Sequence, residues 1–135
     1  MKLNTTFNVN KYGDSDIGFL SPLSRADIPY DIKRIFWITD TLKDVVRGRH
    51  AHIKCLQTYI CLQGKILVES DDGYEKDSKI LNRGDAVTVP PLLWTSEKFL
   101  TGKDILLVIC SHEYDPDDYI FTMDKLLEYI DNNAT

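Results

Sequence analysis

Two histidines, His50 and His52, stand two positions apart within residues 47–54, and they are two of only three histidines in the chain. Residues i and i+2 of a β-strand point to the same face of the sheet, so the two imidazoles are expected to lie side by side. An imidazole titrates near neutral pH, and burying two of them without a role is costly. The pair is therefore a candidate site for proton transfer or metal binding.

Three basic residues, Arg47, Arg49 and Lys54, flank the histidine pair. A cluster of titratable groups that faces into a barrel indicates a functional site more often than a structural one. The alternative is an inherited pair in a barrel that only packs. We favour the functional interpretation.

Length and composition indicate a globular protein and exclude several classes of protein. The chain has 135 residues, which predicts a single domain over residues 1–135. The net charge is −5 without a basic block, so a nucleic-acid partner is not expected. No apolar run approaches the roughly 20 residues of a spanning helix, and the polar start predicts no signal peptide. The three cysteines lack metal-finger spacing and predict buried free thiols in a reducing cytoplasm.

Short apolar or alternating segments recur along the chain, with turn signals between them at residues 63–64, 71–73, 82–85 and 90–91. Strands are expected at residues 17–23, 32–38, 48–54, 56–62, 65–69, 79–81, 86–89, 94–99 and 105–111. Strands at this spacing are typical of an all-β sandwich or barrel. Residues 119–132 carry apolar side chains at helical spacing and predict one C-terminal α-helix. The acidic run from Asp115 to Asp118 is expected to be a solvated turn with helix-capping aspartates.

The spacing also resembles the two motifs of the cupins, which are jelly-roll barrels (double-stranded β-helices). Positions 48–64 resemble the first motif in the His-x-His pair and the closing glycine, and positions 84–95 resemble the second. A metal-binding cupin would carry glutamate at position 57 and a third histidine at position 95, where this chain has Gln57 and Thr95. Two histidines with an amide and a hydroxyl are a weak ligand set for iron, manganese or zinc. We therefore expect no metal.

Metal-free imidazoles can still catalyse a reaction. A neutral histidine can take a proton from a carbon next to a carbonyl if the resulting enolate is stabilised. A second imidazole or Lys54 can donate to the developing oxyanion. These groups suit the tautomerisation of an α-hydroxy ketone through an enediol, which needs no redox cofactor.

At this point the sequence resembles a known family, the sugar-nucleotide 3,4-ketoisomerases, which are small metal-independent cupins. The resemblance extends from about Gly18 to Lys125 and rests on residues 28–34, 47–54, 57–64, 91–94 and 114–120. The Arg-Gly-x-His-Ala-His-x-Lys run and the Tyr-Asp-x-x-Asp-Tyr-Ile run are specific in combination.

The resemblance implies an isomerase that moves the carbonyl of a dTDP-4-keto-6-deoxyhexose from C4 to C3. The substrate expected is dTDP-4-keto-6-deoxyglucose, and the 3-keto product would lead to 3-amino-3,6-dideoxy sugars of surface polysaccharide such as lipopolysaccharide O-antigen. The resemblance also implies a cytoplasmic homodimer that exchanges an N-terminal strand, and it implies no cofactor.

The family's two catalytic histidines correspond to His50 and His52. We expect His52 to be the main base and His50 its partner for the second proton. Arg34 is a candidate contact of the diphosphate, with a solvated surface charge as the alternative. The substrate-binding residues expected are Arg34, Arg47, Lys54 and Gln57.

Several positions depart from the family pattern. Phe36 and Trp37 stand where relatives usually have two tyrosines, so a hydroxyl that assists proton transfer would be missing. Thr95 stands where relatives usually have histidine. Burial habits place Trp37 in the core. The configuration of the product at C4 stays open, and so do two alternatives, a metal-dependent cupin enzyme and a non-catalytic nucleotide-sugar-binding cupin.

Overall fold

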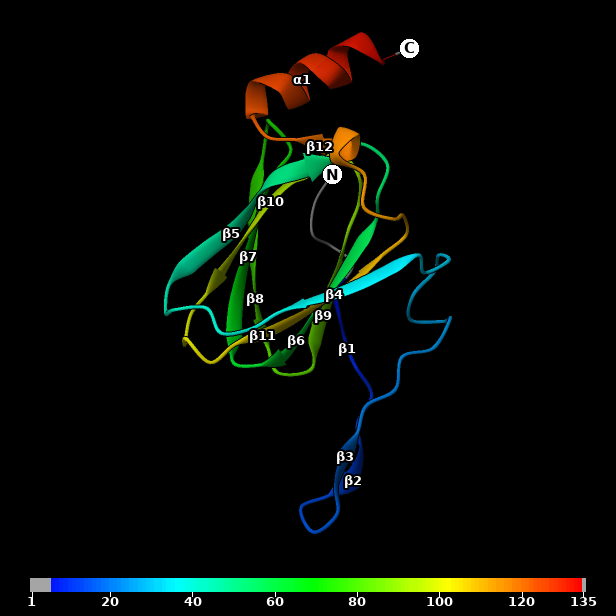
Figure 1. Cartoon of the computed structure of the whole chain (residues 1–135), viewed down its shortest axis with the longest axis vertical. Helices are drawn as coiled ribbons and strands as arrows, with labels where there is room; N and C mark the ends of the chain where they lie inside the picture. The colour runs from blue at the N-terminus through cyan, green and yellow to red at the C-terminus, as the bar shows by residue number, and fades with distance from the viewer. Residues whose placement is uncertain (1–5, 135) are drawn as a thin grey trace.

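The computed structural model describes residues 6–134, and most of its strands form two five-stranded sheets (Figure 1). The first sheet has the order β1 (Thr6–Asn8), β9 (Asp85–Val89), β6 (Gln57–Gln63), β11 (Ile105–Cys110) and β4 (Arg34–Ile38). The second has the order β12 (Tyr119–Ile120), β5 (Val45–His52), β10 (Trp94–Phe99), β7 (Lys65–Asp71) and β8 (Lys76–Asn82). All neighbouring strands are antiparallel. The expected all-β jelly-roll barrel with a C-terminal helix is confirmed.

The period-2 alternation of the strands places one face of each sheet in the core. On β10, Thr95, Glu97 and Phe99 are buried, whereas the residues between them are partly exposed. Both sheets contribute to the main hydrophobic cluster, which includes Phe99 from the second sheet and Leu106 from the first. Two polar residues on the buried face of β10 are a departure from a purely apolar core, and they lie where the functional site is found.

An N-terminal segment covers the outer face of the first sheet. Ile28 packs with Ile60, Ala86 and Ile109 in a second hydrophobic cluster. The hydroxyl of Tyr30 lies 2.7 Å from Thr58 Oγ1 and donates to the carbonyl of Ile109 at 2.7 Å. This cover explains why β6 and β11 read as nearly continuous apolar runs, since both faces of these strands are buried.

The strands β2 (Tyr12–Asp14) and β3 (Gly18–Leu20) form a separate two-stranded hairpin, which we call the arm. The arm extends away from the barrel at the bottom of Figure 1. The expected strand at residues 17–23 is reduced to β3, and the three-residue strands β1 and β2 were not predicted.

The C-terminal helix α1 (Met123–Asn132) begins four residues later than the expected start near residue 119. Tyr119 and Ile120 instead form β12, which pairs with His52 and Ala51 of β5. A 3₁₀ turn, η1 (Pro116–Asp118), precedes this strand. Thr122 caps the helix by accepting from the Lys125 backbone N–H at 3.2 Å. Among residues 6–134, no helix combines the length and the hydropathy that crossing a membrane would require.

Candidate active site

A cavity of about 240 Å³ lies between the two sheets, and strands of both contribute to its wall. The lining residues are Arg34, Phe36, Ile38, Arg47, Gly48, His50, Gln57, Tyr59, Glu97, Leu106, Val108, Tyr114 and Tyr119. The cavity therefore combines an apolar wall with a small number of convergent polar groups, which is typical of a ligand site.

The two histidines of β5 are neighbours, as their spacing predicted. Their ring centroids are 4.9 Å apart and the planes are almost perpendicular, at 88°. His50 lines the cavity, whereas His52 is buried behind it. Burial, and then the charge of His52, lowers the pKa of His50 to about 4. The His50 imidazole is therefore neutral at neutral pH and available to accept a proton.

Asp118 holds His52 in a defined orientation. Oδ2 of Asp118 lies 2.9 Å from Nδ1 of His52, and both side chains are largely buried. A carboxylate only accepts hydrogen bonds, so Nδ1 carries a hydrogen, and Nε2 is the ring nitrogen that faces away from Asp118. Nε2 is buried and has no hydrogen-bond partner among the described residues. The Asp118 carboxylate also accepts from the backbone N–H groups of Lys54 and Cys55, at 2.8 and 3.4 Å.

The predicted substrate-binding residues divide between two places. Arg34, Arg47 and Gln57 line the cavity together with His50. Lys54 does not line it, because its side chain borders an open depression on the other side of Asp118, shared with Lys33 and His112 among others. The cations thus lie at two adjoining sites, which suits a ligand with a neutral reacting group and a distant anionic group.

Positions 57 and 95, which hold a metal in metal-binding cupins, both contact a tyrosine hydroxyl in this protein. The hydroxyl of Tyr59 lies 3.3 Å from Gln57 Oε1 and 3.3 Å from Thr95 Oγ1. Gln57 also donates from Nε2 to Cys110 Sγ at 3.5 Å. An amide and a hydroxyl that already bind protein groups are poor metal ligands. The donor set at these positions does not fit iron, manganese or zinc.

One cluster of metal-ligand types occurs within residues 6–134, formed by His52, Cys55 and Asp118, with ligand atoms within 4.8 Å of one another. Two of its three members, His52 and Asp118, already hydrogen-bond each other. The cluster lies behind His50. We assign its His52–Asp118 contact to ring orientation.

A buried carboxyl, Glu97, also lines the cavity, although it was not among the residues expected at the site. Its exposed fraction is 4%. Burial raises the pKa of Glu97 to about 7, against the opposing effects of the Tyr59 hydroxyl and the Arg47 charge. The acid form of Glu97 is thus populated near neutral pH.

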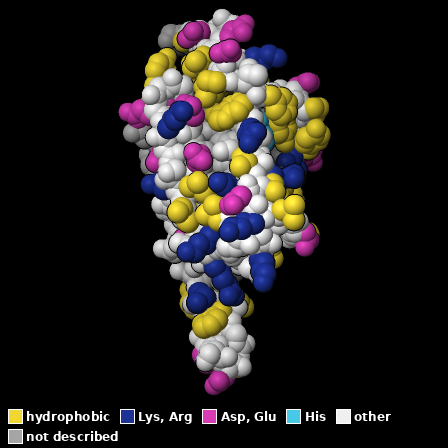
Figure 2. Space-filling model, turned by 90° about the vertical axis from the view of Figure 1, so that its left-hand side faces the viewer, with side chains coloured by type: hydrophobic (Ala, Val, Ile, Leu, Met, Phe, Trp, Pro, Cys, Tyr) yellow, Lys and Arg dark blue, Asp and Glu magenta, His cyan; other side chains and the backbone are white. Residues whose placement is uncertain are grey.

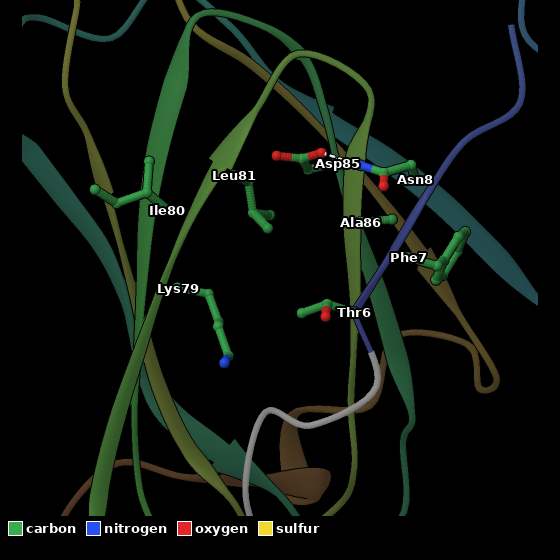
Figure 3. Close-up of a pocket in the computed structure, with 8 residues that line it drawn as sticks. All are labelled: Thr6, Phe7, Asn8, Lys79, Ile80, Leu81, Asp85 and Ala86. Carbon is green, nitrogen blue, oxygen red and sulfur yellow. Dashed lines mark hydrogen bonds between the residues drawn. The ribbon is translucent and has the colours of Figure 1, made fainter.

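A second cavity, of about 280 Å³, lies between β1, β8 and β9 (Figure 3). Its charged lining residues are Lys79 and Asp85. Figure 3 shows that the side-chain amide of Asn8 hydrogen-bonds the carboxylate of Asp85. No histidine or cysteine lines it. This second cavity therefore lacks the imidazole groups that line the first.

Comparison with known proteins decides the family. The family described as FdtA: WxcM-like, C-terminal matches residues 4–131 of this chain. The chain belongs to this family. A TDP-4-oxo-6-deoxy-α-D-glucose-3,4-oxoisomerase from Aneurinibacillus thermoaerophilus is 31% identical over 128 residues, which cover 94% of this chain and 92% of the relative.

Solved structures of FdtA-like proteins agree with this assignment. The sugar 3,4-ketoisomerase QdtA of Thermoanaerobacterium thermosaccharolyticum, in complex with TDP, matches with a TM-score of 0.88, 32% identity and coverage of 97% of this chain and 96% of that chain. A histidine-to-asparagine variant of QdtA, in complex with TDP-4-keto-6-deoxyglucose, matches with a TM-score of 0.89, 31% identity and 99% coverage of both chains. The expected family and its cupin fold are confirmed.

Two site residues of this FdtA-like protein escaped the sequence analysis. Asp118 was expected in a solvated turn, but it is buried beside His52. The Tyr-Asp-x-x-Asp-Tyr-Ile run did mark its position. The sequence did contain one indication of Glu97, because it lies two positions after Thr95 on the same strand and so faces the same way.

The expected position of Trp37 was wrong. Trp37, expected in the core, is 66% exposed on the outer face of β4.

Proposed function

We propose that this single-domain protein is a TDP-sugar 3,4-ketoisomerase that converts TDP-4-keto-6-deoxyglucose to a TDP-3-keto-6-deoxyhexose. The observation that carries the proposal is the neutral His50 in the cavity, with the Asp118-oriented His52 directly behind it. The 3-keto product is a ketone that an aminotransferase can use, so we place the reaction in the biosynthesis of 3-amino-3,6-dideoxy sugars for surface polysaccharide.

The reaction needs a base that removes the C3 proton and returns a proton to C4. His50 meets the requirement because it lines the cavity and its lowered pKa keeps it neutral. His52, which Asp118 holds by a hydrogen bond, packs edge to face against His50 and so fixes the orientation of the His50 ring. From the sequence we expected His52 to be the main base. We now propose the reverse division, since His50 lines the cavity and His52 does not.

Arginine side chains supply charge-assisted hydrogen bonds to the substrate. We propose that Arg47, together with Gln57, contacts the sugar from inside the cavity. Arg34, stacked over the rings of Phe36 and Tyr114 at 4.8 and 5.5 Å, lies where it can reach a phosphate. Lys54, in the adjoining depression, is proposed to attract the diphosphate without direct contact to the reacting carbons. No metal ion or organic cofactor takes part in this proposal.

We further propose that the protein is a cytoplasmic homodimer in which the arms are exchanged. An isolated two-stranded hairpin is marginally stable in water, so the arm needs a surface to pack against. Apolar side chains are exposed on the arm at Ile17 and Leu20 and on the outer face of β4 at Ile35 and Trp37. Figure 2 shows hydrophobic side chains on the narrow extension at the bottom of the molecule. The three free cysteines suit a reducing compartment.

The decisive experiment is incubation with TDP-4-keto-6-deoxyglucose in deuterated water, followed by NMR. We expect the carbonyl to move from C4 to C3 and deuterium to appear at C4. His50→Asn should lower kcat by about 10²–10⁴-fold, because the proton acceptor is lost. Lys76→Gln is the control, since Lys76 is an exposed residue of β8 outside both the cavity and the adjoining depression, and it should leave kcat unchanged.

Two results would reject the proposal. Tight substrate binding with neither carbonyl migration nor deuterium uptake would identify a non-catalytic sugar-binding protein. Activity that is lost with a chelator and restored by iron or manganese would identify a metal-dependent enzyme. Chelator-treated protein is expected to keep full activity.

A further inference from the structure

A 3,4-ketoisomerisation moves two protons, and the histidine pair accounts for one of them. The base transfers the proton from C3 to C4. The second proton must leave the O3 hydroxyl and reach O4, because O3 becomes the carbonyl oxygen and O4 becomes a hydroxyl. A group that lines the cavity, and that can give a proton while taking another, would complete the reaction. This inference rests on the proposed function.

Most polar groups of the cavity wall cannot serve this purpose. The guanidinium groups of Arg34 and Arg47 keep their protons, and the Gln57 amide does not titrate. Burial raises the pKa of Tyr59 well above its ordinary value, so its hydroxyl does not release a proton readily. Glu97 is the single carboxyl among the described residues that line the cavity.

The surroundings of Glu97 hold its carboxyl in place at the cavity wall. Glu97 on β10 lies opposite Arg47 on β5 in the antiparallel register. Its neighbour along that strand is Gly48, where an added Cβ would come within 2.3 Å of Glu97 Oε2. The absence of a side chain at Gly48 therefore leaves the space that the carboxyl occupies. The Tyr59 hydroxyl on β6 lies close enough to the carboxyl to oppose the rise in its pKa.

We propose that Glu97 acts as a carboxylic acid that relays the oxygen-bound proton between O3 and O4 of the sugar. As the base takes the C3 proton, one oxygen of Glu97 donates its proton to O4, and an enediol(ate) forms. As C4 receives a proton, the other oxygen of Glu97 accepts the O3 proton, and the carbonyl forms at C3. The acid is regenerated, so no oxidant, reductant or co-reactant is consumed. A carboxylic acid suits this relay because its two oxygens are a donor and an acceptor side by side.

The protonation behaviour of Glu97 supports this role. Burial raises its pKa to about 7, whereas a glutamate at its ordinary 4.5 would be only about 0.3% protonated at pH 7. The titratable or charged groups that share the cavity are Arg47 and His50 on β5, Arg34 on β4, Tyr59 on β6, Tyr119 on β12 and Tyr114. The acid form is lost as pH rises through about 7, so kcat should fall over that range.

The test uses Glu97→Gln, which keeps the size and the polarity of the side chain but cannot relay a proton. We expect kcat to fall by about 10²-fold or more, with substrate affinity within about threefold of the original protein. The fall of the residual rate above about pH 7 should disappear. Glu69→Gln is the matched control, because Glu69 is an exposed glutamate on the neighbouring strand β7 and should change neither kcat nor its pH dependence.

The other outcomes are also informative. Glu97→Gln with kcat within threefold and an unchanged pH profile would overturn the relay. A rise in the substrate Kd that accounts for the whole loss would also overturn it and would assign Glu97 to binding. If Glu97→Gln fails to fold, Glu97→Asp decides, because it should retain the fall in kcat near neutral pH at a reduced rate. An inactive original protein would reject the proposed function itself, and the relay with it.

Discussion

Asp118 shows how one residue outside the histidine motif defines the site. It lies 66 positions from His52 in the chain, yet their side chains are hydrogen-bonded. The same carboxylate accepts from the backbone N–H groups of Lys54 and Cys55 and so joins η1 to the end of β5. The bond fixes the tautomer and the orientation of His52, which in turn contacts His50 edge to face. Asp118 is thus a positioning residue in our proposal.

Asp118→Asn is expected to lower kcat by about 10²-fold, because an amide can hydrogen-bond His52 in either orientation and no longer selects one tautomer. The pH dependence of kcat should shift with it, which a purely structural role would not cause. Asp117→Asn is the matched control, since Asp117 is an exposed neighbour in the same turn. Steady-state kinetics from pH 5 to 9 would measure both, and an unaltered profile in Asp118→Asn would contradict the positioning role.

At the scale of elements, β5 and β10 build the site together. β5 contains two residues with left-handed backbone, Gly48 with φ 84° and Arg49 with φ 62°. At this place the register between β5 and β10 shifts between Thr95 and Ser96. Such a bulge re-aims side chains next to active sites. Here it lets Glu97 occupy the space beside Gly48.

Gly48→Ala should therefore destabilise the fold more than a comparable substitution elsewhere. Gly84→Ala is the control, because Gly84 has a similar φ of 89° but open space around its added Cβ. The left-handed backbone alone costs about 1–2 kcal/mol for alanine. The contact with Glu97 should add about 1–3 kcal/mol at Gly48. Urea denaturation measures the two free energies of unfolding, and equal losses would show that Glu97 moves aside at no cost.

At the scale of the whole molecule, the exposed apolar residues indicate a surface that another protein chain covers. Trp37 is 66% exposed, although it belongs to a strand whose other face lines the active-site cavity. β4 is also the edge strand of its sheet, with Ile35 exposed beside Trp37. Together with the arm, this face is the interface that our dimer proposal requires, since exposed contiguous apolar area marks protein contacts.

Trp37→Asp is expected to convert the dimer to a monomer, because a charge on the apolar face opposes its burial. Tyr74→Asp is the matched control, since Tyr74 is an exposed aromatic residue in the turn between β7 and β8 and should leave the dimer intact. Sedimentation velocity over a range of concentrations would measure the assembly. A monomeric original protein, or identical behaviour of the two variants, would contradict the proposed interface.

The sequence by itself determined the barrel and the pairing of His50 with His52, because the period-2 alternation of strands and the spacing of turns are set by short stretches of chain. The expectation that Arg34, Arg47 and Gln57 bind substrate came instead from the resemblance to the ketoisomerases, and these three residues do line one cavity. The motif residues and their spacing were also sufficient to predict the family.

Only the tertiary structure decided which residues complete the site. Asp118 joins His52 across 66 positions, and Glu97 becomes a cavity residue only when β10 lies beside β5. The same long-range pairing made Tyr119 and Ile120 a strand, although their apolar spacing predicted helix. Lys54 lies outside the cavity because the backbone after His52 turns toward Asp118, whose carboxylate accepts from the Lys54 N–H. Contacts between distant segments set burial, and burial sets the pKa values on which the chemistry depends.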